Sequence, residues 1–201
     1  RVTPRSRMLI VNSPHNPTGA VLTGTEQAAI AQEAVAPDLV VLSDEAYEHL
    51  WFEGHPHIPL ATLPGMAERT VTVGSAGKSL SFTGWKVGWA TGPADLIGAV
   101  RVIRQHLSYV SGGPFQWAVA AGLNELPRSH WDTVRGTLAH QRDLLTQGLT
   151  EIGLDVLPSQ GTYFLLTDVT GVGYDSGEQF CAELPQRAGV VAIPVAPFCD
   201  D

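Results

Sequence analysis

Lysine is scarce in this sequence of 201 residues. The only two lysines, Lys78 and Lys86, both fall within the stretch VTVGSAGKSLSFTGWKVGW, while every other basic residue is an arginine. Arginine stays protonated in proteins, whereas a lysine can become a neutral amine and act as a nucleophile. The two lysines are therefore the first candidates for chemistry.

Cysteine is equally rare. Cys181 and Cys199 lie near the C-terminus, without CxxC or Cys/His spacing. This argues against a disulfide framework and against a zinc site, and we expect a reducing, cytoplasmic setting. His55 and His57 are close in sequence, but no carboxylate or cysteine completes a metal-binding set at a suitable spacing. We therefore predict no metal and interpret the HPH stretch as a polar loop.

Long apolar runs and basic clusters are also missing. No run approaches the roughly 18 apolar residues of a membrane helix, and no signal peptide opens the chain. The formal net charge is -8, and there is no basic run beyond the three spaced arginines of the start, RVTPRSR. These features disfavour a nucleic-acid surface and a membrane segment, so we expect small-molecule partners. Because the sequence begins with Arg1 almost directly before a strand-like run, we expect its natural N-terminus to lie elsewhere.

The first half of the chain alternates short apolar runs, rich in β-branched residues, with helical or irregular connections. Such continuous apolar strands are typical of a parallel sheet that is buried on both faces. Thr23 and Glu26 have the spacing of a capping box at the start of a helix. The fold class is therefore α/β, with a mostly parallel sheet. The expected strands are 8–13, 39–47, 70–75 and 87–92, and the expected helix is 25–36.

The second half is more helical. Apolar residues at helical spacing predict two long amphipathic helices, with a glycine hinge at 111–113 between helices. A pair of strands around SQGT, a further helix and a final strand then indicate the start of an α+β domain. The expected long helices are 93–110 and 131–153, followed by strands within 154–169, a helix at 177–189 and a strand at 190–195.

Polar side chains lie at the ends of the predicted strands, where an open α/β sheet binds its ligands. Five of them come at or after the end of a strand, and Lys86 comes just before the strand 87–92. Each has an ordinary explanation when taken alone, as a turn, cap, core or solvated-loop residue. Their joint order along successive strands favours a shared site. The candidates are Asn16, Asp44, Tyr47, Ser75, Lys78 and Lys86.

The chemistry of these six residues matches one cofactor. Lys78 can form a Schiff base with an aldehyde, and Lys86 and Ser75 can bind a phosphate. Asp44 can pair with a protonated ring nitrogen, while Asn16 and Tyr47 can bind a phenolic oxygen. These are the groups of pyridoxal 5'-phosphate.

Three motifs carry a resemblance to a known family. The stretches SPHNPTG (13–19), SDEAY (43–47) and SAGKSLSFTGWKVGW (75–89), in this order, resemble the class I/II aminotransferases among the fold-type I pyridoxal-phosphate enzymes. The resemblance covers nearly the whole chain. It implies the PLP-dependent transferase fold and an enzyme that binds pyridoxal 5'-phosphate.

The resemblance also implies a role for each candidate. Lys78 would be the lysine that bonds the cofactor and carries the transferred proton, and Asp44 would be the partner of the pyridinium nitrogen. Asn16 and Tyr47 would bind the ring oxygen, and Ser75 the phosphate. Many relatives have arginine where Lys86 stands, so this phosphate contact would come from a point charge.

Softer motifs in 106–123, 161–168 and 180–200 are most similar to the N-succinyldiaminopimelate aminotransferases of lysine biosynthesis. That branch implies reversible amino transfer between N-succinyldiaminopimelate and 2-oxoglutarate. Four alternatives stay open. They are a kynurenine- or glutamine-type transaminase, a cysteine-conjugate β-lyase, a cofactor-sensing domain of a transcription regulator, and a noncatalytic fragment.

The family's organisation implies how the chain is divided. Residues 1–127 would be the C-terminal part of the large cofactor-binding domain, 128–153 an interdomain helix, and 154–201 the start of a small domain. The family's N-terminal half and its substrate-carboxylate arginine would lie outside this chain. We therefore expect a piece, truncated at both ends, of a longer homodimeric enzyme, and weak or no activity from this piece alone.

Overall fold

The computed structural model describes residues 2–110 and 112–199, which form two compact units. Unit 1 comprises Arg1–Ala139 and Ser159–Phe164, and unit 2 comprises His140–Pro158 and Leu165–Asp201. The division therefore falls inside helix α5 (Arg128–Glu151). Four residues lie outside the described part of the chain, namely Arg1, Ser111, Asp200 and Asp201. Ser111 is the first residue of the predicted hinge, and the other three lie at the outer ends of the predicted domains.

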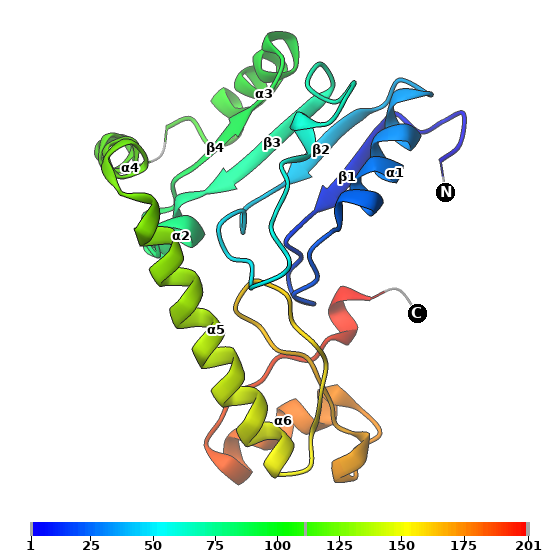
Figure 1. Ribbon diagram of the computed structural model, residues 1–201, viewed down its shortest axis with the longest axis vertical. Helices are drawn as coiled ribbons and strands as arrows, with labels where there is room; N and C mark the ends of the chain where they lie inside the picture. The colour runs from blue at the N-terminus through cyan, green and yellow to red at the C-terminus, as the bar shows by residue number, and fades with distance from the viewer. Residues whose placement is uncertain (1, 111, 200–201) are drawn as a thin grey trace. The chain divides into compact units, whose positions relative to one another are not determined.

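A four-stranded sheet forms the centre of unit 1 (Figure 1). Its strands follow the chain order β1-β2-β3-β4; β1, β2 and β3 are parallel, and β4 is antiparallel to β3. The predicted α/β class with a mostly parallel sheet is confirmed. The last strand reverses direction because its connection, 76–87, contains no long crossover helix that would return the chain to the starting edge. The bounds are β1 (Met8–Asn12), β2 (Val40–Asp44), β3 (Thr70–Ser75) and β4 (Gly88–Thr91).

Helix α1 (Gly24–Val35) covers β1 and β2. Its buried Ala31 and Ala34 pack with Val11 and Val41 in one apolar cluster. The predicted capping box is present, because the Thr23 side chain accepts from the Glu26 backbone and the Glu26 carboxylate accepts from the Thr23 backbone. The start of α1 is thus fixed locally, and its position is fixed by burial against the sheet.

The short connection from β3 to β4 contains α2 (Ala76–Ser79) and a 3₁₀ turn, η2 (Thr83–Trp85). A second apolar cluster joins α2 to helix α4 (Gly113–Glu125). The sequence analysis did not predict α4 as a separate helix. Helix α3 (Ala94–Leu107) matches the predicted helix that begins after a proline. Among the described residues, no helix is both long and apolar enough to span a membrane.

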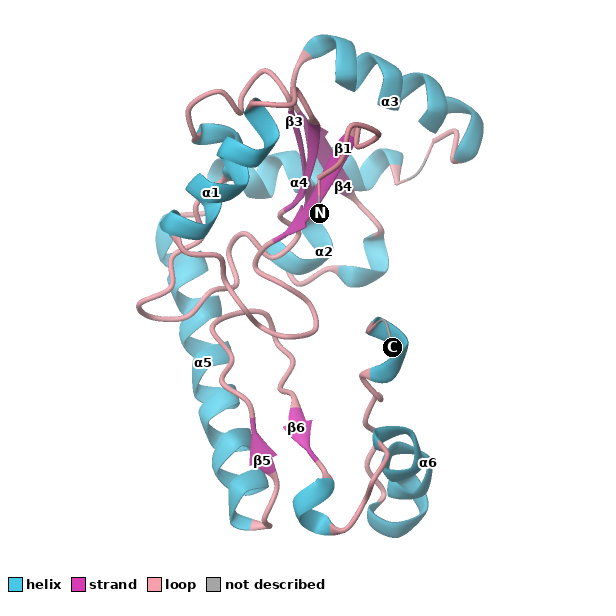
Figure 2. Ribbon diagram, turned by 90° about the vertical axis from the view of Figure 1, so that its right-hand side faces the viewer, coloured by secondary structure: helices cyan, strands magenta, loops and turns pink. Residues whose placement is uncertain are grey.

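Unit 2 contains a short antiparallel pair, β5 (Asp155–Val156) and β6 (Thr167–Asp168), and helix α6 (Gly177–Ala188) (Figure 2). The prediction of a final strand at 190–195 is wrong, because these residues are not in a strand and the side chains of Val190, Val191 and Ile193 are exposed. A strand needs a hydrogen-bonded neighbour, and no described residue pairs with this segment.

Candidate active site

The carboxyl ends of β1, β2 and β3 lie in register. Asn12 pairs with Asp44, and Asp44 pairs with Val73 on the next strand. The Asn12 amide also donates to the Asp44 carbonyl over 2.9 Å, and its side-chain oxygen accepts from the Asn16 backbone over 3.2 Å. Asn12 therefore ties the loop that follows β1 to the end of β2, which brings Asn16 to the same edge of the sheet as Asp44.

Asn16 and Tyr47 meet at this edge. Nδ2 of Asn16 donates to the phenol oxygen of Tyr47 over 2.7 Å. Tyr47 is buried, and this burial, with the neighbouring Tyr163 phenol and the Asp44 charge, raises its pKa above the ordinary value. The Tyr47 phenol is thus held in its neutral form, with its oxygen fixed by the amide.

Lys78 reaches the same place from α2. Its Nζ donates to the phenol oxygen of Tyr163 over 2.6 Å, and the Tyr163 oxygen lies 3.3 Å from that of Tyr47. The Lys78 Nζ also lies 5.6 Å from the centre of the Tyr47 ring. The amine, two phenols and the Asn16 amide therefore form one connected group of side chains.

Tyr163 is the site residue that the sequence analysis missed. Opposing effects act on its pKa. Partial burial raises the pKa. The hydrogen bonds with Lys78 and Tyr47 and the Lys78 charge lower it by more, so the net pKa is below the ordinary value. The two neighbouring phenols thus differ, because Tyr47 resists ionisation and Tyr163 is the easier to ionise.

The other three candidates lie along the same edge. Asp44 is half-buried and its Oδ1 accepts from the Ala46 backbone over 3.1 Å. Ser75 pairs with Gly88, and the Ala76 backbone donates to the Val87 carbonyl over 3.1 Å, so the backbone of Ser75 runs beside the segment that carries Lys86.

Lys86 occupies a tight turn. Its φ of 54° lies in the left-handed region, and its side chain is exposed. The turn directs the chain from η2 into β4. The backbone of Lys86 lies two residues before Gly88, the strand partner of Ser75, whereas the Lys78 amine is held among the phenols.

A second buried polar group underlies the site. The Glu45 carboxylate accepts from the Ser43 hydroxyl over 2.8 Å and from the Leu60 backbone over 3.1 Å, and its other oxygen lies 2.9 Å from Nε2 of His57. The side chains of Glu45 and His57 are only 2% and 4% exposed. HPH lies in a loop, as interpreted, but within this loop the His57 imidazole is buried against a carboxylate. Within the described part of the chain, His, Cys, Asp and Glu do not gather in a set that could hold a metal ion.

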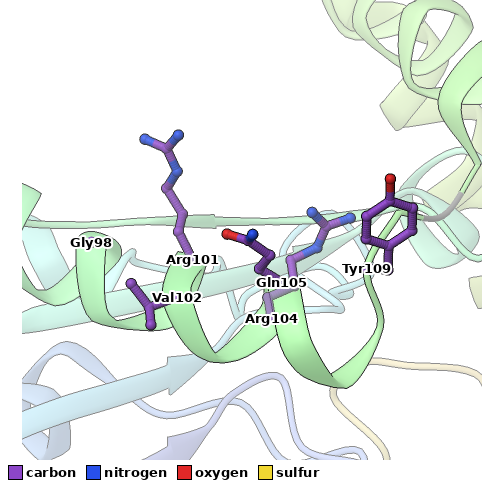
Figure 3. A pocket seen from close by; sticks show the side chains of 6 residues that line it. All are labelled: Gly98, Arg101, Val102, Arg104, Gln105 and Tyr109. Carbon is purple, nitrogen blue, oxygen red and sulfur yellow. The ribbon is translucent and has the colours of Figure 1, made fainter.

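A cavity of about 450 Å³ lies elsewhere in unit 1, along α3. Figure 3 shows the side chains of Arg101, Arg104 and Gln105 rising from the same side of this helix, with Tyr109 beyond its last turn. None of the six predicted site residues lines this cavity. This cavity is therefore separate from the predicted site residues at the edge of the sheet.

Comparison with known proteins points to one family. The sequence profile of Aminotransferase class I and II matches residues 2–199. The chain is 57% identical over 200 residues to the probable N-succinyldiaminopimelate aminotransferase DapC of Mycobacterium tuberculosis. The aligned region covers 99% of this chain and 50% of that protein. It is also 37% identical over 211 residues to kynurenine–oxoglutarate transaminase 3 of Mus musculus, and this aligned region covers 98% of this chain and 46% of that protein.

The fold agrees with these similarities. The solved structure of N-succinyldiaminopimelate aminotransferase from Mycobacterium tuberculosis superposes with a TM-score of 0.96 at 56% identity, covering 100% of this chain and 52% of that one. The chain thus spans about half the length of the curated relatives that it matches.

Proposed function

Because the chain belongs to the class I and II aminotransferase family, we propose that it is part of an aminotransferase that uses pyridoxal 5'-phosphate. The observation that carries this proposal is the position of Lys78. Its amine lies 2.6 Å from one phenol oxygen and within a group that also contains the Tyr47 phenol and the Asn16 amide. An amine held in this way can bond an aldehyde.

The donor set fits the cofactor. The Asn16 amide and the neutral Tyr47 phenol are two hydrogen-bond donors at one point, which suits an anionic ring oxygen. Asp44 supplies a carboxylate for a protonated ring nitrogen, and Ser75 and Lys86 supply a hydroxyl and a positive charge for a phosphate. Lys78 would hold the aldehyde carbon. When bound, the cofactor supplies the electron-accepting ring, and this chain orients it and moves the proton through Lys78.

For the substrate, we propose N-succinyldiaminopimelate, with 2-oxoglutarate as the amino acceptor. The support is the identity of 57% to a relative with this activity in its name, against 37% to a kynurenine transaminase. A comparison of glutamate formation from N-succinyldiaminopimelate and from kynurenine, each with 2-oxoglutarate, in the longer enzyme of which the chain is proposed to be part, tests this choice. Faster turnover of kynurenine would reverse it.

The proposal is tested by covalent labelling. The chain is incubated with pyridoxal phosphate and reduced with borohydride, and the labelled peptide is located by mass spectrometry. We expect the label on Lys78, and Lys78→Ala should remove it while the chain stays folded, because the Lys78 side chain is only partly buried. Lys86→Ala removes the only other lysine and should still be labelled on Lys78, although it binds the cofactor more weakly. A label confined to Lys86, or one that survives in Lys78→Ala, would contradict the proposal.

A further inference from the structure

Tyr163 reaches Lys78 from a distant part of the sequence. It lies on Ser159–Phe164, a short segment that belongs to unit 1 although the residues before and after it belong to unit 2. Lys78 and Tyr163 are 85 residues apart, yet the Lys78 amine donates to the Tyr163 oxygen over 2.6 Å. The contact therefore depends on how this segment is held.

Backbone hydrogen bonds fix the segment on both sides. The Gln160 backbone donates to the Gly19 carbonyl over 2.9 Å and accepts from Phe52 over 2.8 Å, while the Gln160 side chain accepts from the Val21 backbone over 2.9 Å. Thr162 donates to the Leu50 carbonyl over 2.7 Å, one residue before Tyr163. The segment is thus held between the loop that follows β1 and the loop that follows β2, and Tyr163 is preorganised beside the amine.

The environment gives the two phenols different roles. Burial keeps Tyr47 neutral, whereas the Lys78 charge and hydrogen bond favour the ionised form of Tyr163. The charged and titratable groups that act on Tyr163 are Lys78 and Tyr47. Neighbouring titratable groups with pKa values displaced in opposite directions commonly mark an acid–base assignment. Tyr163 is therefore the phenol that can accept a proton.

We propose that Tyr163 is a catalytic residue, the proton acceptor and donor for the Lys78 amine. An ammonium has no lone pair and cannot attack a carbonyl carbon. A proton that leaves Lys78 Nζ passes along the existing hydrogen bond to a Tyr163 phenolate, which yields a neutral amine and a neutral phenol, and the reverse step returns the proton. This inference deepens the proposed function and rests on it.

The first test is a titration that needs no cofactor. The ultraviolet absorbance of tyrosinate is followed against pH in the 201-residue chain, which has four tyrosines. We expect one tyrosine to ionise below the ordinary value of 10, and Tyr163→Phe to remove this step. Lys78→Met should move the step upward, because it removes both the hydrogen bond and the charge. Retention of the low step in Tyr163→Phe would overturn the inference.

The second test measures the rate of reductive labelling of Lys78 by pyridoxal phosphate, with Lys86 as the internal reference. Tyr163→Phe keeps the ring and removes only the oxygen, and we expect it to slow labelling of Lys78 about tenfold without affecting Lys86. Tyr174→Phe is the matched control, because its oxygen bonds to Glu183 in unit 2. An unchanged ratio of Lys78 to Lys86 labelling in Tyr163→Phe would overturn the proposed role of Tyr163 but leave the proposed function standing. Absence of any label on wild-type Lys78 would instead overturn the proposed function, and the inference with it.

Discussion

Nδ2 of Asn16 lies 2.7 Å from the phenol oxygen of Tyr47, although 31 residues separate the two in sequence. The pair forms because the parallel register of β1 and β2 brings Asn12 opposite Asp44 and so brings the loops after both strands together. Its consequence is a fixed pair of donors beside the Lys78 amine.

Tyr47→Phe should weaken the binding of pyridoxal phosphate by about 10- to 150-fold. It removes one hydrogen bond to a charged oxygen, a contribution of about 1.5–3 kcal/mol, while the buried ring keeps its packing. Equilibrium dialysis of the cofactor against both proteins measures the change. Tyr109→Phe, at a phenol on an exposed side chain, should bind as the wild type does. Equal affinity of Tyr47→Phe and wild type would contradict a role of Tyr47 at the ring oxygen.

Lys86→Ala should weaken the binding of pyridoxal phosphate and leave the binding of pyridoxal unchanged. Only the first compound carries the phosphate that Lys86 is expected to contact, so the comparison separates this charge from general effects on the site. Ser75→Ala should show the same selectivity with a smaller effect, because the hydroxyl is a neutral donor whereas Lys86 brings a full positive charge. An equal loss for both compounds would argue for a structural role of Lys86 in its left-handed turn.

Much of the fold and the candidate site could be predicted from local sequence. Continuous apolar runs indicated β1, β2 and β3, and the capping box indicated the start of α1, because these signals depend on residues within one element. The strand-end rule then selected Asn16, Asp44, Tyr47, Ser75 and Lys78, since parallel strands present their carboxyl ends at one edge. The structure puts these residues along that edge.

The misses involve partners that are distant in sequence. Tyr163 lies in an apolar stretch that resembles a strand. Hydrogen bonds between distant parts of the sequence, from Gln160 to Gly19 and to Gln160 from Phe52 and Val21, and from Thr162 to Leu50, bring it to Lys78. His57 lies in a loop, as interpreted, but its burial against Glu45 was not foreseen because Glu45 is 12 residues away with no periodic relation. The false strand at 190–195 shows the converse, since an apolar run without a neighbour remains irregular.

Glu45→Ala should lower the free energy of unfolding by about 3 kcal/mol. Removal of one member of a buried, hydrogen-bonded pair leaves the other without its partner, and His57, Ser43 and the Leu60 backbone all lose an acceptor here. Urea unfolding followed by circular dichroism measures the loss. Glu53→Ala, at an exposed position in the same loop region, should change stability little. A loss of equal size in both variants would contradict this account.

Protonation of His49 should lower the stability of the folded chain as the pH falls from about 6.5 to about 4. Burial, followed by the Arg135 charge, lowers the pKa of His49 to about 4, from an ordinary value of 6.5. Between these values the unfolded chain binds a proton at His49 that the folded chain does not, so protonation favours unfolding. His49→Gln should flatten this part of the profile relative to wild type in thermal unfolding. Parallel profiles for the two proteins would show that His49 titrates normally.

Gly161→Ala should release the segment that carries Tyr163. A Cβ at Gly161 would lie 2.7 Å from the Leu50 carbonyl oxygen and 3.1 Å from Cγ2 of Val21, and the carbonyl belongs to backbone that cannot turn aside. We expect a loss of about 2 kcal/mol in the free energy of unfolding, as for other overpacked sites. Gly136→Ala is the control, because nothing lies within 4 Å of its added Cβ and alanine favours the helix.

The same variant separates packing from chemistry. If Ser159–Phe164 positions the Tyr163 phenol, Gly161→Ala should slow the labelling of Lys78 by pyridoxal phosphate to the rate of Tyr163→Phe, and the double variant should be no slower than either. A common limit arises because both changes remove the same hydrogen bond, one by displacing the oxygen and the other by deleting it. Additive losses in the double variant would mean that Gly161 acts on Lys78 by another route, through the loops that contain Val21 and Leu50.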